Sequence, residues 1–133
     1  MKPYYSPANL ERIPELIRLA PQAAASFLAF EKDVYHAAEA LPPRTKELIA
    51  VAVAHVTGCP YCIDTHVKKY KMLGGSPEEI VEAVLVAAST RAGAILSHAT
   101  HALIAFDQQD GLIAAESSKS GPASSPSDPK CLC

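Results

Sequence analysis

Residues 46–88 read KELIAVAVAHVTGCPYCIDTHVKKYKMLGGSPEEIVEAVLVAA, a stretch in which two helical patterns meet at a glycine. Pro43, just before it, can serve as the first residue of one helix, and Gly58 readily takes the left-handed conformation that ends helices. Pro60 suits the first position of the next helix, which makes Cys59 its N-cap. The stretch therefore predicts two helices joined by a tight turn, with Cys59 and Cys62 at a helix N-terminus.

The remaining patterns also indicate helices. Apolar residues recur at helical spacing over 9–20 and 22–39, and the helix over 43–58 is apolar on nearly all sides after Leu48, which predicts a central position. A fourth helix runs from 60 to the glycines at 74 and 75. Ser76 and Glu79 form a capping-box sequence that opens a fifth helix to about residue 91. Gly93 is expected to mark a bend or close contact before a sixth segment that runs to about residue 109.

Composition agrees with this interpretation. Hydrophobic residues make up 49% of the 133 residues but aromatic residues only 6%, and alanine is frequent, which suits closely packed helices better than strands. We expect an all-α fold, a compact bundle of about six helices over residues 1–115. From residue 116 the chain is rich in Ser, Pro and Gly, and this composition predicts a disordered tail over 116–133. We interpret Cys131 and Cys133 there as incidental thiols, with a prenylation signal or an internal reductant as the alternatives.

Charge and hydropathy exclude several classes of function. A formal net charge of -2, with no basic cluster beyond KKYK at 68–71, argues against nucleic-acid binding. No stretch approaches the ~20 uninterrupted apolar residues that span a bilayer, and the charged, proline-containing N-terminus is unlike a secretory signal. We therefore expect a cytoplasmic protein that does not enter the membrane. In such a protein, cysteines are more often catalytic or metal-binding than structural.

Four residues carry the candidate chemistry. A thiol reacts as thiolate, which is favoured at a helix N-terminus, where Cys59 and Cys62 are placed. Cys62 and His66 share a helical face one turn apart, so the imidazole can accept the thiol proton. Two cysteines at this spacing can also close a disulfide. Glu47, on the preceding helix, is a candidate to orient His66, as third members of nucleophile and base sets do.

Other interpretations of these residues stay open. The cysteines can be small buried residues at a helix start, and Glu47 can be a first-turn carboxylate favoured by the helix dipole. A zinc site would add His98 and His101 to the two thiols. Otherwise we expect these two histidines to line the core or a subunit contact. His55 is expected to be a hydrogen-bonded residue at its helix end.

The stretch resembles the core motif of the carboxymuconolactone decarboxylase superfamily, in its alkyl hydroperoxidase D-like branch. The resemblance covers about residues 40–105 and consists of a Glu, eleven residues, CxxCxxxH, a Gly-Gly pair and an acidic capped helix. It implies that Cys59 and Cys62 form a redox dithiol and that Glu47 and His66 form a proton relay. The decarboxylase branch lacks the CxxC, so the motif argues against lactone decarboxylation.

The resemblance further implies a peroxidase that works without an organic cofactor or metal. A thiolate attacks a small hydroperoxide, the other cysteine resolves the sulfenic acid to a disulfide, and a dithiol donor, a lipoyl or thioredoxin-like protein, reduces it. We favour Cys62 as the attacking thiolate and Cys59 as the resolving one, and the reverse assignment remains open. The resemblance also implies a homo-oligomer, with a hexamer built as a trimer of dimers as the first expectation.

One position departs from the pattern. Tyr61 stands between the cysteines where the peroxidase prototype has a further histidine of the relay, and a phenol is a poor base at neutral pH. We treat Tyr61 as a residue that tunes the site. The alternatives to a peroxidase are a noncatalytic redox sensor or oligomeric scaffold that keeps the dithiol, and an enzyme of the decarboxylase type.

Overall fold

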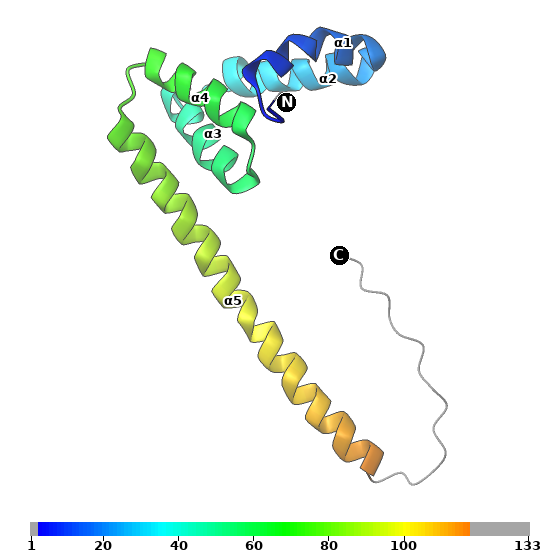
Figure 1. The fold of residues 1–133 in the computed structure, drawn as a ribbon. Helices are drawn as coiled ribbons and strands as arrows, with labels where there is room; N and C mark the ends of the chain where they lie inside the picture. Colours follow the sequence, from blue (N-terminus) through cyan, green and yellow to red (C-terminus); the bar gives the residue numbers. More distant parts are fainter. Residues whose placement is uncertain (1–2, 118–133) are drawn as a thin grey trace. The chain divides into compact units, whose positions relative to one another are not determined.

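The computed structural model describes residues 3–117, and within that range it contains helices and turns but no strand (Figure 1). The all-α prediction is confirmed, with five α-helices among the described residues instead of six. In chain order the elements are the 3-10 helix η1 (Pro7–Arg12), α1 (Ile13–Leu19), α2 (Pro21–Lys32), the π-helix η2 (Asp33–Ala37), α3 (Pro43–Thr57), α4 (Pro60–Met72) and α5 (Pro77–Ser117).

The helix count differs because the predicted fifth and sixth helices are one helix, α5. Gly93 lies inside it, without a positive φ, and a Cβ added at this position would meet nothing within 4 Å. The prediction of a bend or close contact at Gly93 was therefore wrong. A glycine costs a helix only about 1 kcal/mol relative to alanine, which the alanine-rich neighbours on both sides of it offset.

The chain divides into two compact units, one comprising Met1–Gly93 and the other beginning at Ala94. All residues of the candidate site lie in the first unit. The predicted tail, 116–133, lies outside the described residues from 118 onward, as do Cys131 and Cys133.

Helix α5 has the length and composition of a membrane-crossing helix over Pro77–Gln109, with a mean hydropathy of 1.5 in its apolar window and none of that window buried within the chain. The sequence-based expectation rested on an uninterrupted apolar run, which this segment lacks because polar residues such as His98 and His101 interrupt it. Length and composition are shared by membrane spans and by helices that pack inside proteins.

The core of the first unit lies between α3 and α4, which run side by side (Figure 1). Val51 and Ala54 of α3 are buried, as is Tyr70 of α4, and this agrees with the predicted central position of α3. Glu47, one turn before Val51, is the buried charged residue of the described chain.

The connection between α3 and α4 has the predicted geometry. Gly58 caps α3 in the left-handed region, with φ 69° and ψ 42°. Pro60 opens α4, and Cys59 is its N-cap, whose sulfur accepts a hydrogen bond from the backbone N–H of Cys62 over 3.2 Å. The turn is short, so the end of α3 fixes the position of the first turn of α4.

A second turn attaches the start of α5 to the α3–α4 pair. Ser76 and Glu79 form the predicted capping box, each backbone N–H donating to the other side chain over 3.2 Å. Glu79 also accepts hydrogen bonds of 2.6 Å from the Tyr70 hydroxyl and from Arg44 of α3. The bonds from Tyr70 and Ser76, with the nearby charge of Arg44, lower the pKa of Glu79 to about 2.

The predicted first and second helices are less regular than their patterns indicated. The first begins as the 3-10 helix η1 and becomes α-helical at Ile13, because Pro14 is tolerated only in a first turn. The second ends in the π-helix η2. Lys46 of α3 donates from Nζ to the carbonyl oxygens of Val34, at 2.6 Å, and of Ala38, which holds η2 against α3.

Candidate functional site

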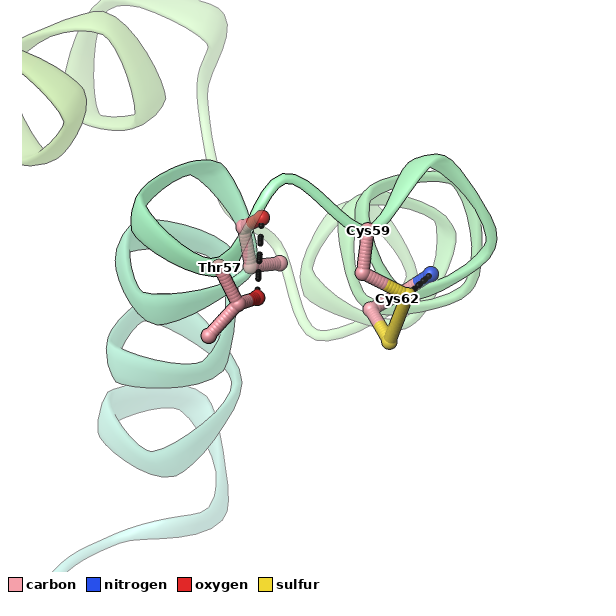
Figure 2. The surroundings of a disulfide bond; sticks show 4 residues. Thr57, Cys59 and Cys62 are labelled. Atoms are coloured by element: carbon pink, nitrogen blue, oxygen red, sulfur yellow. Dashed lines mark hydrogen bonds between the residues drawn. A yellow bond between two sulfur atoms is a disulfide. The ribbon is translucent and has the colours of Figure 1, made fainter. Parts of the chain in front are cut away.

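The centre of the site is a disulfide between Cys59 and Cys62 (Figure 2). Both residues are half-buried at the start of α4, and their Cα atoms are 5.3 Å apart. Thr57, at the end of α3, bonds its hydroxyl back to the carbonyl oxygen of Ala54 over 3.3 Å (Figure 2). The sequence predicts that these two cysteines act as a redox dithiol. They lie close enough together to form and break a disulfide.

Glu47 and His66 form a buried pair next to this dithiol. Oε2 of Glu47 lies 2.6 Å from Nδ1 of His66, and the side chains are only 8% and 15% exposed. An ionised carboxylate accepts hydrogen bonds only, so Nδ1 carries the proton and Nε2 is left as the acceptor. The structure therefore brings the predicted relay residues together across α3 and α4.

The ring of His66 is held from a second direction by Tyr35 of η2. The two rings stack, with centroids 5.8 Å apart and planes inclined by 16°. Burial raises the pKa of Tyr35, and the charges of Glu47 and Glu31 add to this effect. Tyr35 thus stays a neutral phenol at physiological pH and acts on His66 through packing.

A cavity of about 560 Å³ opens beside Cys62 and His66. Its wall is mainly apolar and comes from η2, the η2–α3 connection and α3, and the other ionisable residues that line it are Lys46 and Tyr35. The apolar lining residues are Val34, Ala38, Ala40, Leu41, Ile49, Ala50, Val53 and Ala54. Cys62 reaches this cavity whereas Cys59 is not among its lining residues.

A second cavity, also of about 560 Å³, is lined by Glu47 and Tyr35 together with Glu31, His36 and Lys69. Tyr35 thus lines both cavities. Glu47 connects this second cavity to His66, which lines the first one.

The other predicted positions have separate surroundings. Nδ1 of His55 lies 2.7 Å from the carbonyl oxygen of Val51, which confirms the expectation of a hydrogen-bonded histidine at a helix end. His98 and His101 stack on one another in the second unit, with centroids 5.7 Å apart. Among the side chains that the structure describes, those of residues 3–109, no group of three or more His, Cys, Asp or Glu is arranged as a metal site.

Tyr61 points its hydroxyl toward the N-terminal segment. The side-chain amide of Asn9 donates to the Tyr61 oxygen over 2.7 Å and to the carbonyl oxygen of Tyr4 over 2.9 Å. The ring of Tyr61 also packs against Tyr5, with centroids 5.4 Å apart.

Sequence reasoning missed Tyr35 and Asn9 as residues of the site. Tyr35 falls within the helical pattern over 22–39, and nothing in that pattern signals the π-helical turn that directs it onto His66. π-helical turns are common at functional sites, but they are recognised from hydrogen bonding and not from composition. Asn9 lies 52 residues from Tyr61, and a contact at that separation has no local signal.

The model of the carboxymuconolactone decarboxylase family matches residues 21–105 of this sequence, a range that contains all four proposed site residues. The chain belongs to the carboxymuconolactone decarboxylase family. The match begins earlier than the resemblance seen from the motif alone, and it includes α2 and η2, which carry Tyr35. It excludes η1 and α1.

Two other proteins are similar to this chain. "Uncharacterized protein 4 in cox locus" of Paracoccus denitrificans is 55% identical over 86 residues, which are 65% of this chain and 77% of the relative. The crystal structure of a protein from Methanobacterium thermoautotrophicum has a TM-score of 0.62 and 31% identity, covering 65% of this chain and 96% of that one.

Proposed function

We propose that this member of the family is a thiol peroxidase, which reduces small hydroperoxides through a dithiol–disulfide cycle of Cys59 and Cys62. The observation that carries the proposal is the joint position of Cys62 and His66 on one cavity, with Glu47 bonded to the far nitrogen of the imidazole. A thiol needs a base to become a nucleophile, and here the base has its own orienting carboxylate.

The reaction balances with the residues present. Nε2 of His66 takes the proton of Cys62, and the thiolate attacks the terminal peroxide oxygen as the O–O bond breaks, which leaves a sulfenic acid and an alkoxide. The imidazolium of His66 returns the proton to the alkoxide, which departs as the alcohol. Cys59 then attacks this sulfur, and water leaves as the disulfide forms. Two electrons from an external dithiol return the pair to thiols.

Cys62 is the attacking residue in this proposal, as the sequence favoured. Two observations support the assignment: Cys62 lines the cavity, and His66 lies on the same helical face one turn on. Cys59, whose sulfur accepts the Cys62 N–H at the helix N-cap, is the resolving residue.

The cavity supports an organic hydroperoxide as substrate. Apolar side chains line most of it, so a hydrocarbon group would be desolvated there while the peroxide group reaches Cys62. The donor is a protein or cofactor dithiol, lipoyl or thioredoxin-like, and the cytoplasm is the proposed compartment because its thiol pool stays reduced.

Assembly into a homo-oligomer, a hexamer built as a trimer of dimers, completes the proposal. Helix α5 supports it, because large apolar side chains between Val81 and Phe106 are more than half exposed in the single chain, and an extensive apolar helix surface is normally buried. These side chains are Val81, Leu85, Val86, Ile95, Leu96, Leu103, Ile104 and Phe106.

Steady-state consumption of cumene hydroperoxide with dihydrolipoamide as reductant tests the function. Wild type should turn over, whereas the variant with both Cys59→Ser and Cys62→Ser should fall to the uncatalysed rate. Equal rates for both proteins would refute the enzymatic role and favour a redox sensor or scaffold. Lactone decarboxylation would be indicated instead by an activity on a carboxymuconolactone that survives loss of both thiols.

A further inference from the structure

The middle of the CxxC motif contacts a segment that lies outside the family match. Asn9 is in η1, ahead of residue 21 where the match begins. Its side-chain amide donates to the Tyr61 hydroxyl of the motif and to the Tyr4 carbonyl of its own segment. Tyr5 adds ring packing against Tyr61, so residues 4–9 cover the aromatic side chain between the two cysteines.

We infer that residues 4–9 form a strap that stabilises the Cys59–Cys62 disulfide through Tyr61, so that Asn9 and Tyr61 set the redox poise of the site. The inference rests on the proposed dithiol cycle and adds a positioning role to it. It also gives Tyr61 a function other than proton transfer, because its oxygen accepts the Asn9 hydrogen bond and its ring lies against Tyr5.

The strap and the disulfide are thermodynamically linked through Tyr61. The disulfide closes a ring that contains the backbone of Tyr61, and this ring fixes the direction of the side chain that Asn9 binds. Reduction adds two electrons and two protons, breaks the S–S bond, and lets the two thiols separate. The strap then loses its fixed partner. Because coupling between two events is reciprocal, a strap that binds the oxidised form better must also favour the disulfide.

The size of the effect follows from the contact. One hydrogen bond in a partly exposed position changes an equilibrium constant by about threefold to tenfold. Asn9→Ala and Tyr61→Phe should each raise the equilibrium constant for reduction by glutathione by about this factor, and tenfold corresponds to ~30 mV in a two-electron couple. The variants should therefore be easier to reduce than wild type.

The test is a glutathione redox titration of the full chain, followed by alkylation and mass analysis of the tryptic peptide over residues 47–68, which separates these cysteines from Cys131 and Cys133. Arg12→Gln is the matched control, because Arg12 lies in η1 but pairs with Glu15 over 2.8 Å. We expect a wild-type midpoint for this control. The double variant of Asn9→Ala with Tyr61→Phe should shift the midpoint no further than either single change.

The outcomes separate the two proposals. Normal titration with equal midpoints in wild type, Asn9→Ala and Tyr61→Phe would overturn the strap, as would additive shifts in the double variant. A cysteine pair that no glutathione ratio reduces would instead overturn the dithiol cycle on which the strap depends. The titration needs no peroxide, so loss of peroxidase activity in a variant does not affect the result.

Discussion

The charge of Glu47 is the residue-scale feature with the most specific consequence. Glu47 is buried and its carboxylate lies 2.6 Å from His66. In the proposed relay this charge would stabilise the imidazolium that forms when His66 takes a proton. Changing Glu47→Gln keeps an acceptor oxygen but removes this charge. We expect kcat/KM for cumene hydroperoxide to fall about tenfold or more, with the ~10²–10⁴-fold contribution of general acid–base catalysis as the upper limit.

The control for this variant is Asp64→Asn, which makes the same carboxylate-to-amide change on α4, where Asp64 pairs with Lys68 at the surface over 2.8 Å. Its kcat/KM should equal that of wild type. If Glu47→Gln and Asp64→Asn both keep wild-type activity, the carboxylate of Glu47 has no part in the relay.

At this scale the sequence identifies candidate residues, and the structure adds how their side chains are oriented. Cys59, Cys62 and His66 lie on one helix, so their relation follows from spacing alone. Glu47 is on another helix, and its approach to His66 depends on how α3 packs on α4. Tyr35 and Asn9 come from distant elements, so only the folded chain reveals them.

At the scale of elements, the turn between α4 and α5 contains Gly75, which no larger residue can replace unless neighbouring atoms move. A Cβ at Gly75 would lie 2.1 Å from the ring of Tyr70, which is 1% exposed. Gly75→Ala should lower the free energy of unfolding by about 1–3 kcal/mol, the usual range for overpacking.

Gly93→Ala is the matched control, because the same change inside α5 meets no atom within 4 Å. It should raise the free energy of unfolding by about 0.5–1 kcal/mol through helix propensity. Urea unfolding measures both variants. Equal stability of the two would show that the ring of Tyr70 does not occupy the space beside Gly75.

Glu79, in the same turn, makes the stability of the fold depend on pH. The pKa of Glu79 falls from an ordinary 4.5 to about 2 in the folded chain, so the stabilisation is complete above pH 4.5 and is lost as the pH falls toward 2. In wild type the urea midpoint of unfolding should therefore fall as the pH is lowered from 4.5 toward 2. Glu79→Gln should flatten that drop, whereas Glu78→Gln, one position earlier in the first turn of α5, should keep it. An identical acid profile for Glu79→Gln and wild type would contradict the assignment.

Elements with strong end signals were predictable, and those without them were not. Pro43, Gly58, Pro60 and the Ser76 box fix helix ends through local chemistry, and the structure confirms each of them. The π-helical end of the second helix has no such signal. Gly93 was misread because a lone glycine weakens a helix without ending it.

At the scale of the whole molecule, the exposed apolar residues of α5 predict self-association. Replacing both Leu96 and Leu103, which are 75% and 67% exposed in the single chain, by Glu should lower the native mass measured by light scattering. Gln108→Glu adds charge to the same helix without removing an apolar side chain and should keep the wild-type mass. Recovery of wild type only in the membrane fraction, or as a monomer in detergent-free buffer, would contradict the oligomer.

The number of thiols lost per peroxide reduced tests the central claim most directly. Reduced wild type should be mixed with one equivalent of cumene hydroperoxide, followed by measurement of the alcohol formed and the thiols lost in the peptide over residues 47–68. The proposed cycle predicts one alcohol and two thiols lost per chain, recovered as the Cys59–Cys62 disulfide, and neither product in Cys62→Ser. Peroxide left intact, or alcohol formed while both thiols remain free, would contradict it.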